Sequence, residues 1–146
     1  MSKPPSGSQW ICFHLANEIY AVPALNIQEI TPYSVPNPCP GSPSYVEGIL
    51  DIRGTVITVF SGRQLIAGEG EAKNASHIIV MEEALGAVGM SIDGVEGMAS
   101  FYSDQIQTAR HSDNEFIVGT VNHREQLVIL VDLARCCANL LDSEEP

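Results

Sequence analysis

The residues that could carry out acid–base, nucleophilic or phosphate chemistry do not fall into the spacings that such chemistry requires. A catalytic centre brings a nucleophile or a base together with the groups that activate it. The four histidines form neither an HxH nor an HExxH pattern: His14, His77, His111 and His123. Ser61 lacks the leading glycine of a GxSxG elbow, and neither GxGxxG nor a P-loop pattern occurs. Folding could bring together Asp93, Asp104 and Asp113, but no spacing singles them out. We therefore expect a protein without catalytic residues.

The cysteines give no better indication of a metal site. Four are present, at Cys12, Cys39, Cys136 and Cys137, and none forms a CxxC pair. Adjacent residues of a helix point in different directions, so Cys136 and Cys137 cannot form an ordinary zinc half-site. We expect structural thiols, no metal and no cofactor.

Composition and charge narrow the class of partner. Hydrophobic residues make up 45% of the 146 residues, which is typical of a globular domain. The net charge of −11, from 18 acidic and 7 basic residues, repels nucleic acids and anionic lipid headgroups. No stretch has the roughly 18 continuous apolar residues of a membrane span, and the first residues are polar rather than leader-like. We expect a cytoplasmic protein that binds no nucleic acid and does not insert into a membrane.

The elements that must position these side chains are predicted to be short strands. Apolar runs alternate with turn residues, which indicates antiparallel hairpins. The predicted strand pairs are 10–15 with 19–22, 48–52 with 55–60, 78–82 with 87–92, and 116–122 with 126–131. Further extended segments are predicted at 27–30 and 95–99, and short helices at 61–65 and 133–141, capped by Ser61 and Asp132.

The second half of the sequence repeats the plan of the first. With an offset of 71 residues, Gly48 aligns with Gly119 and no gap is needed in the segment that follows. This alignment places Arg53 on Arg124, and one predicted helix cap on the other. Two shorter similarities precede it: Ala21–Val22 resembles 87–88, and 27–30 resembles 95–98.

A strand-rich unit that occurs twice implies two small barrels or curled sheets. Closing a short sheet removes edges that invite aggregation, and the thin core of each half favours a shared interface. We predict an all-β fold with short helices, a shared hydrophobic core and a groove between the halves. The predicted boundaries are a flexible segment at 1–8, one domain at 9–141 with lobes at roughly 16–75 and 76–135, whose terminal segments can cross between lobes, and an acidic tail at 142–146.

A polar pattern leads up to Arg53. In an extended segment Ile27 and Glu29 share one face, and on a later strand Asp51 and Arg53 share another. An arginine beside a turn glycine can reach the carboxylate of Glu29 or Asp51. Such a contact is either a surface ion pair worth about 0.5 kcal/mol, or a bidentate pair that fixes strand geometry beside a docking groove.

The sequence resembles the CheW family in segments spread over residues 9 to 138. The matching segments are 13–22, 27–30, 43–57, 88–95 and 119–133. Their order and spacing, more than any single motif, make the resemblance specific. It implies two SH3-like five-stranded barrels around a common core, a C-terminal helix and a non-enzymatic adaptor. The implied partners are the cytoplasmic hairpin tip of a methyl-accepting chemoreceptor and the regulatory domain of a CheA-type histidine kinase.

The resemblance also implies a site. Receptor docking is expected at Ile27, Glu29, Gly48, Arg53 and Val95, with Glu29 and Arg53 as a supporting ion pair. The sequence departs from the family at Ser61-Gly62, where an Asp-Leu pair is usual, and at Asp51-Ile52-Arg53, where Asn-Leu-Arg is usual. A helical glycine costs about 1 kcal/mol relative to alanine. The first departure bears on whether the helix after Ser61 contacts the usual kinase.

Two alternatives remain open at this point. Within the family, an adaptor of a pilus-motility or gene-control pathway would carry the same pattern. Outside it, a small-ligand-binding barrel or a small enzyme would need an apolar cavity or converging reactive groups. The family resemblance places the protein in the cytoplasm, at receptor arrays on the inner membrane.

Overall fold

The computed structural model of this chain describes residues 8–68, 75–83, 86–108 and 116–132. Its strands are β1 (Ser8–Leu15), β2 (Glu18–Pro23), β3 (Ile27–Pro32), β4 (Val46–Ile52), β5 (Thr55–Ser61), β6 (His77–Glu83), β7 (Gly86–Ile92), β8 (Gly94–Phe101), β9 (Gln107–Thr108), β10 (Ile117–His123) and β11 (Gln126–Val131). Short helical turns occur at η1 (Ala24–Asn26), η2 (Arg63–Ala67) and η3 (Ser103–Gln105). The all-β prediction is confirmed, and each of the four predicted hairpins is present.

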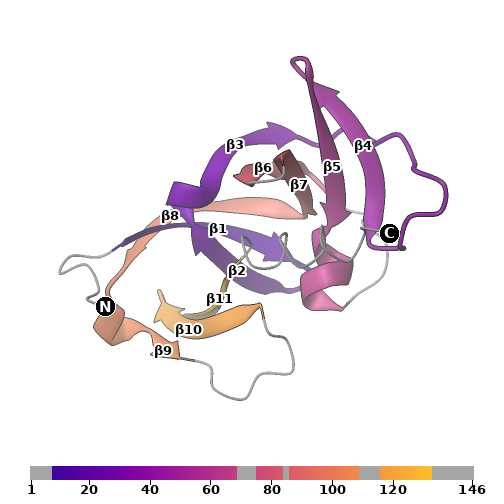
Figure 1. The fold of residues 1–146 in the computed structure, drawn as a ribbon. Coiled ribbons are helices and arrows are strands. Elements are labelled where there is room, and N and C mark those ends of the chain that lie inside the picture. The colour runs from indigo at the N-terminus through magenta and orange to yellow at the C-terminus, as the bar shows by residue number, and fades with distance from the viewer. Residues whose placement is uncertain (1–7, 69–74, 84–85, 109–115, 133–146) are drawn as a thin grey trace.

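The strands form two curled sheets that pack against each other (Figure 1). The five-stranded sheet, called lobe 1 here, has the order β3-β6-β7-β5-β4 and carries η2. The six-stranded sheet, called lobe 2, has the order β8-β1-β2-β11-β10-β9. These sheets divide the chain differently from the predicted lobes at 16–75 and 76–135. Strands β1 and β2 complete lobe 2, whereas β6 and β7 lie in lobe 1, because strand pairing follows long-range contacts rather than sequence order.

The predicted repeat corresponds to the pairing pattern of the two lobes. The hairpin β4–β5 matches β10–β11, and both Gly48 and Gly119 lie at a β-bulge. The two arginines share a left-handed backbone, with φ of 51° at Arg53 and 52° at Arg124. In each lobe the second strand of the hairpin pairs in parallel with another strand, β5 with β7 and β11 with β2.

One predicted similarity is out of register. Ala21 pairs with Leu130, and Gly89 pairs with Val59, which lies 71 residues earlier than Leu130. Ala21 therefore corresponds to Gly89 rather than to Ala87, two residues from the predicted match. The similarity of 27–30 and 95–98 agrees with the structure, because Glu29 pairs with Val80 as Gly97 pairs with Cys12.

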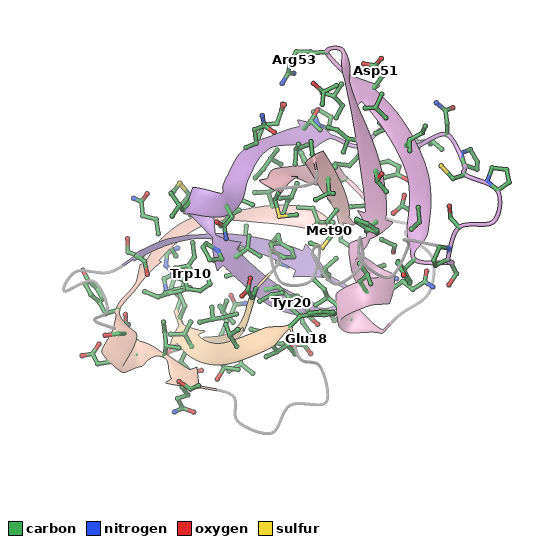
Figure 2. All side chains as sticks on the ribbon, viewed as in Figure 1. Trp10, Glu18, Tyr20, Asp51, Arg53 and Met90 are labelled. Atoms are coloured by element: carbon green, nitrogen blue, oxygen red, sulfur yellow. The ribbon has the colours of Figure 1, made fainter. Side chains whose placement is uncertain are left out.

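Buried side chains form three clusters, one inside each lobe and one between the lobes. The cluster between the lobes, called the shared core here, contains Phe13, Leu15, Tyr20, Val22, Phe60, Ile66, Ile79, Met81, Val88, Met90, Ile92 and Val131. These residues come from both sheets, and Figure 2 shows Tyr20 and Met90 in the layer between them. The predicted shared hydrophobic core is confirmed.

The helix after Ser61 forms. It is short because it ends at Gly68, whose backbone is left-handed. The Ser61 hydroxyl accepts a hydrogen bond from the Gln64 backbone N–H at 3.2 Å, as the predicted cap requires. The turn η2 ends at Gly68, which has a φ of 71°. The predicted terminal helix at 133–141 lies outside the described residues. The turns η1 and η3 and the short β9 were not predicted.

Two adjacent isoleucines allow a test of the shared core. Ile78 and Ile79 are both fully buried in β6, but Ile78 faces the core of lobe 1 and Ile79 faces the shared core. Ile79→Val should lower the free energy of unfolding by about 0.5–1.5 kcal/mol. It should also accelerate amide hydrogen exchange in β1 and β2 of the other sheet, because these strands pack on the same cluster.

The matched control is Ile78→Val, which removes the same methylene from the opposite face of the strand. Its effect on hydrogen exchange should stay within the five-stranded sheet. Unchanged exchange in β1 and β2 of the Ile79→Val protein would contradict the role assigned to the shared core.

Candidate functional site

The predicted ion pair is present and lies at the end of lobe 1. The Arg53 guanidinium contacts the Glu29 carboxylate, and Figure 2 shows Arg53 at the tip of the β4–β5 hairpin. The side chain of Arg53 is 73% exposed and that of Glu29 is 27% exposed. Asp51, the other candidate partner, instead accepts a hydrogen bond from the Gly54 backbone N–H at 2.8 Å. Asp51 therefore shapes the turn, and Glu29 holds the arginine.

Side-chain contacts join the two edge strands of lobe 1. Strands β3 and β4 are the outermost strands of this sheet, yet Glu29 on β3 reaches Arg53 beyond β4. At the other end of the same strands, the Tyr33 hydroxyl donates to Glu47 at 2.6 Å. Because β3 and β4 run in opposite directions here, the two contacts fasten the open side of the sheet at both ends.

Glu47 is a further, partly buried acceptor that the sequence did not reveal. Its carboxylate also accepts from the hydroxyl of Ser91, which is 1% exposed. Burial, followed by the hydrogen bond to Glu47, raises the pKa of the Tyr33 phenol, so the hydroxyl remains a donor. Only its place beside Gly48 in a family-like segment could have indicated this role.

Gly48 is buried and allows two backbone segments of the site to lie close together. Asn37 and Ile49 exchange two backbone hydrogen bonds of 2.9 Å beside it. A Cβ atom at position 48 would lie 2.1 Å from the Asn37 carbonyl oxygen, and Gly48 has a φ of +145°. Only glycine permits this close approach without a backbone shift. Gly48 thus acts through strand geometry rather than through a side chain.

A groove lies beside the ion pair. It is called the lobe-1 groove and is lined by Gln28, Glu29, Ile52, Arg53, Thr55, Ile57, Val80 and Ala87. Ile57 and Val80 belong to the core of lobe 1 and are almost fully buried, so the accessible lining of the groove is mainly polar and its rim is charged.

Lobe 2 carries an equivalent groove at the corresponding end. It is called the lobe-2 groove and is lined by Cys12, Ile19, Glu96, Gly97, Met98, Ala99, His123, Arg124, Gln126 and Val128. Arg124 stands where Arg53 stands, but Gly97 replaces Glu29. The neighbouring Glu96 instead lies 2.6 Å from Nε2 of His14. The repeat therefore preserves the groove and changes its polar contacts.

The remaining predicted docking residues are apolar and divided between the lobes. Ile27 on β3 is half-buried against the shared core, and Val95 on β8 is 40% exposed. The prediction that Ile27 and Glu29 share one face by simple alternation is wrong. A β-bulge between them shifts the register, so Ile27 and Ile30 both pack on the shared core.

Four of the five predicted residues thus lie on lobe 1, and Val95 lies on lobe 2. The other exposed large apolar side chains are spread over the two lobes: Leu25, Val35, Val56, Met98, Tyr102 and Leu127. Leu25 is 94% exposed and lies in η1, the turn that immediately precedes β3. The site combines an ion pair with unpaired apolar surface on two sheets.

The groups considered for chemistry have structural contacts. Nδ1 of His77 lies 2.8 Å from the Ser76 hydroxyl, and the His123 ring meets Phe101 edge-on, with 5.3 Å between ring centroids. Burial, followed by the charge of Glu96, raises the pKa of the Cys12 thiol, which disfavours the thiolate. Within the described residues, no group of three or more His, Cys, Asp and Glu side chains could hold a metal. His111 and Asp113 lie outside these residues.

Comparison with known proteins identifies the family to which this chain belongs. The model of the CheW-like domain matches residues 9–140. The chain belongs to the CheW-like domain family. The chemotaxis protein CheW of Klebsiella aerogenes is 28% identical over 144 residues, covering 95% of this chain and 84% of the relative. CheW of Rhizobium meliloti is 22% identical over 132 residues, covering 87% and 85%.

A solved CheW structure shares the fold. The crystal structure of the scaffolding protein TtCheW from Thermoanaerobacter tengcongensis has 22% sequence identity and a TM-score of 0.76, covering 91% of this chain and 89% of that one. As a member of the CheW-like family, the chain is a scaffold-type protein and not an enzyme. Among the described residues, no helix has the length and apolar character to cross a membrane.

The structure explains the departure from the CheW pattern at position 62. A Cβ atom on Gly62 would lie 2.4 Å from the Ser91 carbonyl oxygen and 3.0 Å from Cδ2 of Leu15. The start of η2 therefore approaches β7 and β1 more closely than a leucine would permit. Glycine at position 62 permits this close packing.

The energetic effect of the close approach at Gly48 can be measured by comparison with Gly97. Both have positive φ, +145° and +134°, but a Cβ atom at Gly97 would meet nothing within 4 Å. We expect Gly48→Ala to lower the free energy of unfolding by about 1–3 kcal/mol more than Gly97→Ala, because only position 48 is overpacked. Urea unfolding of both variants gives the two values, and equal losses would contradict the contact with Asn37.

Proposed function

We propose that the protein is a non-enzymatic adaptor that couples methyl-accepting chemoreceptors to a CheA-type histidine kinase. The observation that carries the proposal is the Glu29–Arg53 ion pair, which spans the edges of lobe 1 beside the lobe-1 groove in a CheW family member. The pair fixes the end of the lobe and leaves most of the arginine exposed to a partner.

The chemistry of this surface suits an amphipathic helical hairpin such as a receptor's cytoplasmic tip. Ile27 and Val95 supply apolar contacts for the hydrophobic face of a helix, and Leu25 extends them. Glu29 and Arg53 supply a polar rim that sets orientation. Gly48 contributes by holding the strand that leads to Arg53. Receptor docking at these five residues remains a proposal that mutation can test.

The proposed kinase contact uses the ends of the lobes. A kinase regulatory domain built on the same duplicated plan would present ends of similar shape. The lobe-1 and lobe-2 grooves are equivalent in place but differ in charge, since Glu29 corresponds to Gly97. Such a difference allows each end to select its own partner surface.

The adaptor's output is positional. It holds receptor and kinase so that the state of the receptor biases kinase activity, and it acts in the cytoplasm at receptor arrays on the inner membrane. The same geometry would serve a pathway of pilus motility or gene control with a different receptor and kinase. Identification of the receptor and the kinase that co-purify with this chain distinguishes these pathways.

Arg53→Glu tests receptor docking. The change places a second negative charge beside Glu29. Because position 53 is exposed, the fold should persist while the charge of this side chain at the rim of the groove is reversed. We expect the affinity for the receptor's cytoplasmic hairpin to fall by about tenfold or more, which is about 1.4 kcal/mol. Calorimetric titration with the hairpin fragment measures the change.

The matched control is Arg124→Glu, the same substitution at the equivalent turn of lobe 2. It should leave receptor affinity unchanged. Equal affinity of the Arg53→Glu protein and the unmodified protein would remove Arg53 from the site. A metabolite that co-purifies in either groove, without a kinase, would favour a ligand-binding barrel instead.

A further inference from the structure

Asp93 occupies the point at which the chain passes from one lobe to the other. It is the single residue between β7 of lobe 1 and β8 of lobe 2. Its backbone N–H donates to the His14 carbonyl oxygen at 2.9 Å. Its carboxylate oxygen Oδ2 accepts from the Ala16 backbone N–H at 2.8 Å. Asp93 therefore binds the end of β1 with its backbone and the β1–β2 turn with its side chain.

The same carboxylate oxygen also binds lobe 1. Oδ2 of Asp93 accepts from Nε of Arg63 at 3.0 Å, and Arg63 is the first residue of η2. The side chains of Arg63 and Asp93 are only 20% and 12% exposed. A charged pair this far from solvent is screened less than a surface pair, and the loss of one partner leaves the other uncompensated. The close approach at Gly62 brings the start of η2 near β7 and β1.

These hydrogen bonds help to fix the relative orientation of the two lobes, which the shared core does not fix. Apolar burial holds the lobes together, but it is non-directional and does not fix their relative orientation. Charge-assisted hydrogen bonds have preferred distances and angles. The contacts of Asp93 with Ala16 and Arg63 are directional links between the two lobes at the crossover.

The proposed docking surface depends on that orientation. Ile27, Glu29, Gly48 and Arg53 lie on lobe 1, whereas Val95 lies on lobe 2, two residues after Asp93. A change in lobe orientation would move Val95 relative to the other four residues. A helical hairpin that contacts both lobes would then lose complementarity without losing a contact residue.

We infer that Asp93 is a positioning residue for receptor docking, acting through Arg63 and the β1–β2 turn to set Val95 against the lobe-1 half of the site. This inference rests on the proposed receptor function and extends it to a residue that does not itself touch the receptor.

The test measures affinity for the receptor's cytoplasmic hairpin fragment in the full-length protein, well below the unfolding temperature. Asp93→Asn keeps the shape of the side chain but removes the charge on Oδ2, the oxygen on which the N–H groups of Ala16 and Arg63 converge. We expect the dissociation constant to rise about five- to tenfold and the methyl NMR signals of Val95 to shift. Asp104→Asn, which removes the same charge from the exposed turn η3, should change the dissociation constant less than twofold.

Arg63→Gln is the second variant, because it leaves the Asp93–Ala16 hydrogen bond in place if Asp93→Asn folds poorly. The two single variants and the double variant should weaken binding by similar factors, since all three break the same link. A lower melting temperature with unchanged affinity and unchanged Val95 signals would show a purely structural role and overturn the inference. Failure of the unmodified protein to bind the hairpin would overturn the proposed function as well.

Discussion

The burial of central strands on both faces is the constraint on which the rest of the structure depends. In β1, β2, β6 and β7, one face packs inside a lobe and the other faces the shared core. Strands buried on both sides have near-continuous apolar sequences rather than an alternating pattern. Neither lobe can leave its partner without exposing one of these faces to water. The two sheets therefore form one folding unit, and the grooves at their ends keep a defined relation to each other.

The two lobes share their backbone geometry but differ in the polar contacts of their side chains. The bulge glycines, the left-handed arginines and the parallel strand pairs recur at matching places. The polar contacts at the lobe ends differ, because Glu29 has Gly97 as its counterpart while Glu96 contacts His14. Specificity in such a protein resides in a few rim residues, and the backbone beneath them is common to both lobes.

The sequence predicts what is local and misses what depends on distant pairing. The four hairpins and the Ser61 cap follow from turn residues and apolar runs that lie close together in the chain. For Arg53, the turn position left Glu29 and Asp51 as candidate partners, and only the family resemblance selected Glu29. The assignment of β2 to one lobe and β6 to the other was not predicted, because nothing local distinguishes their partners. The bulge after Ile27 and the contacts of Glu47 and Asp93 escaped for the same reason, as each requires the assembled sheets.

The parallel pairing of β2 with β11 has a consequence for synthesis. Strand β2 ends at Pro23 and β11 begins at Gln126, so lobe 2 joins segments made early and late on the ribosome. The strands of lobe 1 are contiguous in the chain and can assemble on β1 and β2 while translation continues. Lobe 2 must wait for its last hairpin to emerge, and until then the apolar faces of β1 and β2 that it will cover are open to chaperones. A ribosome stalled before β10 would hold a chain in which β2 still lacks its parallel partner β11.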